Sequence, residues 1–476
     1  MTVAHIAADR IAPPSAERLP YKWKLLVSVI FGVFMSTLDT TAVNVAFPTL
    51  RSMYGATLHE AQWIVSIYVM ALGIATPVAG FLADRFGIKR IYVLGLAIFV
   101  SGSIVAGFAP TLGVLVVARA VKGFGGGIAM PCATAMLFRG FDRKELGFAL
   151  GVFGLALLFA PALGPVLAGV LIDHHRWRWI FFINVPIGLL GIALAGRFLR
   201  EQRASRVPGW DGWGLASAAV GFGSLLYAAS IVAQRGWRAP EVIGSLALGA
   251  CALSALAFVE LRHARDPLLD LRLFRRRGFL IATLVGYVTV VAFFGAEFLL
   301  PVYLQAVRGR SALEAGMALL PLALGAGVTM PIAGKIYDRI GPRPLIVSGF
   351  ALLLHNTWEL SHLTATTSYR FILLLMAVRG LALGIAVQTP FTAALASVSH
   401  EAVPRASSLV ISTRLAVQAI GVAVLATLLA SATDLTGFAR AYGLTFYLAL
   451  GALCLGLLLP GWPRAWTAAP ADESTT

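Results

Sequence analysis

Charged residues are scarce in this sequence. Only 13% of its 476 residues are charged and 58% are hydrophobic, whereas about 25% charged is usual for a soluble domain. Stretches such as 25–38, 91–109 and 279–300 carry almost no charge. Because about 20 apolar residues cross a bilayer core as a helix, these stretches predict membrane-spanning helices and exclude a soluble globular protein.

Cysteine is also rare. The three cysteines, Cys132, Cys251 and Cys454, lie far apart inside apolar stretches, with neither pairing nor metal-ligand spacing. This excludes a disulfide framework and a zinc site. The apolar stretches also lack a nucleophile–base set or paired metal ligands, which argues against an intramembrane enzyme. The sequence therefore predicts neither a metal site nor a cofactor.

Basic residues are in excess, and their distribution decides what the excess means. A net charge of +16 could indicate a nucleic-acid partner, but the basic residues lie in short connections between apolar stretches rather than in one patch. The densest cluster is 262–277. Such a bias is typical of cytoplasmic loops, so we expect no nucleic-acid partner. It predicts a multi-pass protein of the inner (cytoplasmic) membrane with both termini in the cytoplasm.

Fourteen apolar stretches are interpreted as spans. They are 25–48, 61–82, 91–109, 111–131, 147–171, 179–197, 211–233, 240–260, 278–304, 313–334, 344–362, 371–392, 406–430 and 442–462. An even number of spans places both ends of the chain on one side of the membrane.

Short motifs recur in the same order in the two halves of the chain. The pairs are GFLADRFGIKR from Gly80 with GKIYDRIGPR from Gly334, VKGFGGGIA from Val121 with VRGLALGIA from Val378, and ALGPVLAG from Ala162 with AIGVAVLA from Ala419. Three matches at nearly one spacing predict two related six-helix bundles around a midplane cavity, as transporters use for alternating access. The predicted parts are a cytoplasmic tail at 1–24, bundles at 25–198 and 278–462, a linker with two extra transmembrane helices at 199–277, and a cytoplasmic tail at 463–476.

Several of these motifs carry a resemblance. The loop pattern G-x-L-A-D-R-x-G-x-K-R comprises Gly80, Leu82, Ala83, Asp84, Arg85, Gly87, Lys89 and Arg90. The first span holds L-D-x-T-x-V-N-V-A-x-P with Asp39 and Asn44, the fourth span holds R-x-x-x-G at Arg119 and Gly123, and WRWIFFINVPIG starts at Trp177. Over about residues 25–462 the chain thus resembles the major facilitator superfamily, and within it the fourteen-helix drug:proton antiporter branch (EmrB/QacA type).

The resemblance extends to the fifth predicted span. The family's antiporter motif there is G-x8-G-x3-G-P-x2-G-G, and the residues that match it are Gly151, Gly164, Pro165 and Gly169. Ala160 and Ala168 replace two of the glycines. Small residues let helices approach closely and Pro165 loosens the helix for bending, so the motif favours proton antiport driven by the proton gradient.

Ionisable residues within spans are the candidates for proton coupling or substrate binding. A carboxylate near the midplane, such as Asp39, is costly unless it faces water or a partner; the alternative is a structural Asp bonded to the fourth span. Arg119 cannot neutralise itself, and the resemblance implies a role in proton coupling; the alternative is a fixed cation that ties spans one and four. Lys122 either shares that environment or reaches the interface. Glu297 is a second candidate proton or cation site, or else part of an outer polar cluster.

Two further groups of residues have predicted roles. Asp84 and Arg85 predict a gate, because an acid at a helix end can pair with a neighbouring helix in one access state and release it in the other. Asp338, Arg339 and Arg343 form the weaker counterpart in the second half. On periodicity alone, the candidate cavity residues are Asn44, Gln388, Arg414 and Gln418.

The function that these patterns favour is proton-coupled export of small lipophilic compounds or drugs by alternating access. The alternative is a facilitator or proton symporter of a metabolite, although few hydrogen-bonding side chains for a nutrient occur in spans one, two and five. A nontransporting receptor leaves the gate-like loop unexplained. Some relatives work with a periplasmic adaptor, and the need for one stays open because the connection between spans thirteen and fourteen is short. The charge of the substrate also stays open, since both acids and arginines lie in the spans.

Overall fold

The computed structural model describes residues 20–174, 176–202, 209, 211–262, 267–310, 312–399, 401–430 and 435–459. Most of the predicted tail 1–24 and all of the predicted tail 463–476 lie outside these ranges. The side chains of Pro165 and Glu297 are likewise outside the described part, although the backbone of both residues is helical.

The part of the chain that the structure describes folds into helices, without strands. The first helices are α1 (Tyr21–Met53), α2 (Leu58–Phe86), α3 (Ile88–Phe108), α4 (Leu112–Gly140), α5 (Arg143–Asp173), α6 (Trp179–Phe182), α7 (Asn184–Phe198), α8 (Gly212–Arg235) and α9 (Pro240–Arg262). After the 3-10 turn η1 (Leu271–Arg275) follow α10 (Arg277–Val302), the π-helical turn η2 (Tyr303–Val307), α11 (Ala312–Met317), α12 (Leu320–Ile340), α13 (Pro342–Ser361), α14 (Tyr369–Ala386), α15 (Gln388–Ala396), α16 (Val403–Ala430) and α17 (Leu435–Gly456).

All fourteen predicted spans coincide with helical residues, but their number is not confirmed. Eleven helices within the described ranges are long and apolar enough to cross a membrane. The chain is therefore a multi-pass, all-helical membrane protein, and fourteen stays a prediction.

Three predicted spans are interrupted, and a proline accompanies each break. The span 179–197 is divided between α6 and α7, and the span 371–392 between α14 and α15. Pro186 and Pro390 lie in the first turns of α7 and α15, where a residue without an amide hydrogen is tolerated but cannot continue the preceding helix. Pro321 does the same at the start of α12, which divides the span 313–334.

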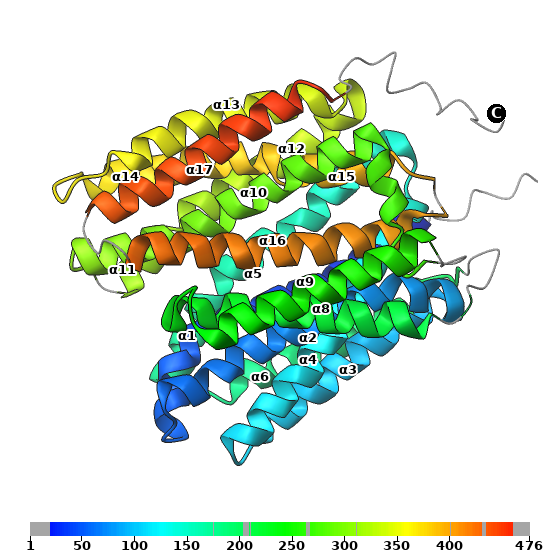
Figure 1. Cartoon of the computed structure of the whole chain (residues 1–476), viewed down its shortest axis with the longest axis horizontal. Coiled ribbons are helices and arrows are strands. Elements are labelled where there is room, and N and C mark those ends of the chain that lie inside the picture. The colour runs from blue at the N-terminus through cyan, green and yellow to red at the C-terminus, as the bar shows by residue number, and fades with distance from the viewer. Residues whose placement is uncertain are drawn as a thin grey trace, which may run out of the picture.

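Helices α5 and α16 connect the two groups of helices. In Figure 1 they lie between an upper group, with α10, α12, α13, α14 and α17, and a lower group, with α1 to α4 and α6. Helix α5 packs against α1 and α12, and α16 packs against α2, α4 and α10. Because α5 and α16 carry the matching segments ALGPVLAG and AIGVAVLA, the two contacts α5–α12 and α16–α2 are repeats of each other.

Helices α8 and α9 form a pair beside this junction. They pack against each other, and α8 also packs against α2 and α16. Much of α9 is exposed, including Ile243, Leu248 and Phe258. Exposed apolar side chains on a helix of a membrane protein are suited to face lipid.

Candidate functional site

Asp39 lies at the centre of a buried polar cluster. Its carboxylate accepts hydrogen bonds from Arg119 and from Lys122, both on α4. Asn184, at the start of α7, donates from Nδ2 to Asp39 Oδ1 at 3.1 Å. Asp39, Lys122 and Asn184 are 0% exposed and Arg119 is 1% exposed, so the cluster ties α1, α4 and α7 together away from solvent.

Aromatic rings and a backbone carbonyl hold the two cations of this cluster. Arg119 donates from Nε to the carbonyl oxygen of Ile64 at 2.8 Å, and its guanidinium lies 4.2 Å from the centre of the Tyr68 ring. The Lys122 ammonium lies 4.9 Å from the Phe99 ring centre and 5.1 Å from that of Phe181. Cation–π contacts of this kind are strongest where water is excluded.

The cluster has features of both roles that the sequence left open for Asp39, the structural one and proton coupling. Asp39 is bonded to the fourth span, as a structural carboxylate would be, and Lys122 shares its environment instead of reaching the interface. One carboxylate faces two cations, so adding or removing a proton on Asp39 would change the attraction between α1 and α4. The geometry is therefore compatible with both a structural and a proton-coupling role.

The matching segment of the second half buries a different arrangement. Arg379, on α14, is 0% exposed and donates to Asn356 Oδ1, Thr357 Oγ1 and the carbonyl oxygen of Ala292, at 3.2, 3.0 and 2.8 Å. Its Nε has no hydrogen-bond partner among the described atoms. Glu297 lies on the same helix as Ala292, and the position of its side chain is outside the described part.

The predicted gate residue Asp84 joins α2 to α4 and α16. Its carboxylate accepts from Arg405 Nε at 3.1 Å and lies 3.8 Å from Arg139. Asp84 is 3% exposed, and Gly80, one turn earlier, packs against α16, where an added Cβ would meet the Pro404 carbonyl oxygen at 2.8 Å. The structure thus contains a paired form of the predicted gate. Arg85, the next residue along α2, is half-buried, with its guanidinium 5.8 Å from the centre of the Phe86 ring.

The remainder of this loop is held by Glu201, from the segment after α7. Gly87 has φ +101°, which turns the chain into α3 without a capping side chain of its own. Glu201 accepts instead from the backbone amides of Lys89 and Arg90, at 3.1 and 3.2 Å. Lys89 Nζ in turn donates to the carbonyl oxygens of Gly196 and Leu199, both at 2.8 Å. The loop is therefore fixed to the last turn of α7.

Asp338 forms the counterpart contact in the second half. Its carboxylate accepts from the backbone amides of Gly147 and Phe148 on α5, at 2.7 and 3.0 Å. Gly334 packs directly on the Gly147 carbonyl. Helices α12 and α5 thus meet as α2 and α16 do, with an acid of one half against the first turns of a helix of the other. We refer to this side of the molecule as the Asp84 end.

The glycines of the antiporter motif separate into two kinds. An added Cβ on Gly151 would meet the Met330 carbonyl oxygen of α12 at 2.7 Å, and one on Gly164 would meet Thr41 of α1. Both positions therefore permit the predicted close approach. At Gly169, by contrast, an added Cβ would meet nothing within 4 Å among the described residues, so no close approach is observed there.

The four candidate cavity residues lie in different surroundings. Asn44 is exposed on α1, and Gln418 is half-buried on α16. Gln388 is 6% exposed and lines a small cavity between α5, α12 and α15, together with Gly147, Gly151, Met330 and Thr392. Arg414 is half-buried on α16, with its guanidinium 5.5 Å from the centre of the Phe391 ring.

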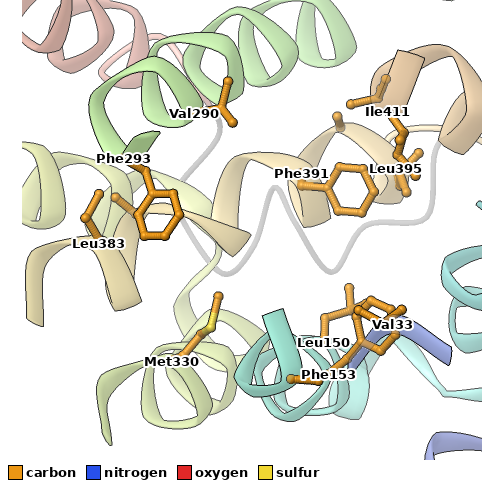
Figure 2. Close-up of a cluster of buried hydrophobic side chains, with 14 of the residues drawn as sticks. Val33, Leu150, Phe153, Val290, Phe293, Met330, Leu383, Phe391, Leu395 and Ile411 are labelled. Atoms are coloured by element: carbon orange, nitrogen blue, oxygen red, sulfur yellow. The ribbon is translucent and has the colours of Figure 1, made fainter. Parts of the chain in front are cut away.

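An apolar barrier fills the interior between the two groups of helices. Figure 2 shows Val33, Leu150 and Phe153, from α1 and α5, facing Phe391, Leu395 and Ile411, from α15 and α16. Val290, Phe293, Met330 and Leu383 continue the same cluster. The interior near these residues is suited to contact with apolar surfaces.

Sequence reasoning missed three partners of these sites. Asn184 lies within the quoted motif WRWIFFINVPIG, so a signal was available. Arg405 lies just before the predicted span 406–430, which the repeat pairs with the fifth predicted span. Its position opposite Asp84 becomes evident only from the packing of the helices. No pattern in the sequence points to Glu201.

Comparison with known proteins agrees with this architecture. The model of the Major Facilitator Superfamily matches residues 29–426. The multidrug resistance protein B homolog of Mycobacterium tuberculosis H37Rv is 33% identical over 84% of this chain and 75% of its own. The methylenomycin A resistance protein of Streptomyces coelicolor is 33% identical over 86% of both chains. The human organic anion transporter MFSD10 shares the fold, with a TM-score of 0.63 and 16% identity over 90% of this chain and 100% of its own.

Proposed function

The chain belongs to the Major Facilitator Superfamily and is a membrane transporter rather than an enzyme. We propose that it exports small lipophilic compounds in exchange for protons. The observation that carries the proposal is the Asp39 cluster. A carboxylate held by two buried cations can couple its protonation to helix packing, because a neutral carboxyl group attracts Arg119 and Lys122 much less than a carboxylate does.

Alternating access is the mechanism that we propose for the export. The contacts of Asp84 with Arg405 and of Asp338 with α5 hold the Asp84 end together. Opening this end requires both contacts to break, and they lie at repeated positions between the predicted bundles 25–198 and 278–462. Two inserted helices in 199–277, and fourteen spans in all, would place the chain in the drug:proton antiporter branch.

Two observations support a lipophilic compound as the cargo. The names of the two bacterial relatives refer to resistance against drugs and against methylenomycin A. The barrier of Figure 2 offers apolar side chains from both groups of helices. An interior of this kind favours compounds that bury apolar surface.

The distribution of basic residues supports an orientation. We propose an inner-membrane location with the Asp84 end and both termini facing the cytoplasm, since Lys89, Arg90 and the basic cluster 262–277 lie in loops assigned to that side.

The test is transport in proteoliposomes with an imposed pH gradient. The parent protein should move a lipophilic dye against its gradient, and Asp39→Asn should abolish the gradient-driven part while leaving downhill exchange of the dye. Glu297→Gln tests the second predicted acid in the same assay. Full gradient-driven transport by both variants would remove the proton-coupling assignment, and dye movement along the direction of proton flow would favour a symporter.

A further inference from the structure

The acid at the centre of the first half is already occupied by protein groups. Three side chains donate to Asp39, namely Arg119, Lys122 and Asn184, and Asp39 is 0% exposed. A cationic compound would have to displace two cations of the protein to reach this carboxylate. Asp39 is therefore poorly suited to bind a positively charged substrate directly.

Arg414 has the opposite character. It is half-buried in the interior part of α16, and within the described residues its one recorded interaction is with the face of Phe391 at 5.5 Å. No ion pair or hydrogen bond of its guanidinium is found in that part of the chain. An arginine in a membrane span is costly unless water, an acid or a bound anion compensates its charge, and the described residues place no acid beside Arg414.

The other buried arginine of the second half is not accessible in this way. Arg379 is 0% exposed, and three neutral oxygens accept its hydrogen bonds. Arg414 combines partial exposure with a lack of acidic partners among the described residues. It is the better candidate for contact with a bound compound.

The residues around Arg414 are suited to form the apolar part of a binding site. Arg414 lies three residues after Ile411, which is a little less than one helical turn, and on the side of the barrier away from the Asp84 end. Arg414 contacts the ring of Phe391. Figure 2 shows Phe391 on the same side of the apolar cluster as Leu395 and Ile411, and we call these three residues the apolar floor. A cation beside an apolar floor matches a molecule with an anionic group and an aromatic or aliphatic body.

We propose that Arg414 binds the carboxylate or sulfonate of an amphiphilic anion, whose apolar body packs against Phe391. This inference rests on the proposed export function and adds the charge class of the cargo. A guanidinium can hold a carboxylate through two parallel hydrogen bonds, which gives specificity as well as affinity. The Phe391 ring, already in contact with Arg414, positions the guanidinium for that interaction.

The experiment compares two probes with the same aromatic body and opposite charge, 1-pyrenebutyrate and 1-pyrenemethylammonium. Binding to the purified full chain in detergent is measured by thermal shift and by titration of pyrene fluorescence. We expect the parent to bind the carboxylate more tightly than the ammonium. Arg414→Gln should weaken carboxylate binding by about tenfold or more, because a charge-assisted hydrogen bond is lost.

Matched variants separate binding from folding. Arg440→Gln removes the same charge from an exposed position on α17 and should leave both affinities unchanged. Arg414→Lys should retain part of the carboxylate affinity, and Phe391→Leu should weaken it with Arg414 still present. Tighter binding of the ammonium by the parent, or undiminished carboxylate binding by Arg414→Gln, overturns the inference.

Transport of the same probes distinguishes this inference from the proposed function. Proton-driven export of the ammonium probe that is insensitive to Arg414→Gln leaves the exporter assignment standing and overturns the anion site. Carboxylate binding that depends on Arg414, together with transport that is insensitive to the pH gradient, supports the anion site and overturns proton coupling.

Discussion

Lys122 and Arg379 occupy the same position in the two matching segments VKGFGGGIA and VRGLALGIA, and both are 0% exposed. Lys122 donates to the carboxylate of Asp39, whereas Arg379 donates to a side-chain amide, a hydroxyl and a backbone carbonyl. Within the described residues, the two halves thus hold equivalent cations by different means. Only the contact of Lys122 can be weakened by protonation of its partner, the carboxylate of Asp39.

This difference predicts unequal costs for the same substitution. Lys122→Gln removes one of the two charge-assisted hydrogen bonds of a buried carboxylate that keeps Arg119, and such bonds contribute about 1.5–3 kcal/mol each. Arg379→Gln loses hydrogen bonds to three neutral oxygens but also removes a buried charge that no described acid offsets, so a smaller net cost of about 1 kcal/mol is expected.

Thermal unfolding in detergent compares the two variants. The Tm of Lys122→Gln should fall clearly below that of Arg379→Gln, with the parent as reference. A larger loss for Arg379→Gln would mean that the arginine has a charged partner of its own.

The ion pair of Asp84 with Arg405 predicts that substitutions of these two residues have non-additive effects on opening of the Asp84 end. Ser408 is 0% exposed and contacts Gly80, so a cysteine at this position, in a chain whose native cysteines are replaced by serine, reports separation of α2 and α16. Asp84→Asn and Arg405→Gln should each accelerate thiol labelling of Ser408→Cys. The double variant should add little, because both changes break one interaction.

The control for this measurement is a pair that is also near the Asp84 end. Lys22 and Glu145 form an ion pair with side chains 31% and 41% exposed. Exposed pairs contribute little, about 0–1 kcal/mol, so Glu145→Gln should leave the labelling rate unchanged. Equal acceleration by all variants would show a general loosening instead of a specific contact.

The glycines of the helix crossings predict a position-dependent response to alanine. Gly334→Ala forces a Cβ against the backbone of Gly147 and should separate α12 from α5, at a cost of about 1–3 kcal/mol. Gly169→Ala places a Cβ where no described atom lies within 4 Å, so it should be neutral, or stabilising through the helix propensity of alanine. Dye transport and Tm measure both variants, and equal loss at the two positions would contradict the contact.

Glu201 predicts a local effect on the loop between α2 and α3. Glu201→Ala removes the acceptor for the amides of Lys89 and Arg90, and loss of a helix cap costs about 1 kcal/mol. Hydrogen exchange at these two amides should then become faster by about fivefold or more. Glu201→Gln keeps one acceptor oxygen and should give an intermediate rate. Unchanged exchange in Glu201→Ala would show that the loop is held by Lys89 alone.

The sequence predicted the helical fold well because lipid imposes a strong constraint on it. Long uncharged stretches have few alternatives to a helix in a bilayer, and within the described residues each of the fourteen predicted spans is mostly helical. The breaks before Asn184, Leu320 and Gln388 were missed because apolar residues continue through them. The prolines at 186, 321 and 390 were the available signal.

The site was predicted less completely because its contacts join distant parts of the chain. Asp39 and Arg119 were identified as buried ionisable residues from their surroundings in the sequence. Their actual bond, and the bond of Asn184 with Asp39, depend on how α1, α4 and α7 pack. Periodicity likewise assigned Arg414 to the interior but gave no information on whether an acid would lie beside it.

The crossing of α16 onto α2 also constrains the order in which the protein can be completed during synthesis. Asp84 precedes Arg405 by 321 residues, so the ribosome releases α2 long before its partner exists. Until then, the surface of α2 that receives Gly80, Asp84 and their neighbours must be shielded by lipid, by the translocon or by a chaperone. A chain truncated before α16 would leave that surface uncovered, which gives membrane quality control a defined feature to recognise.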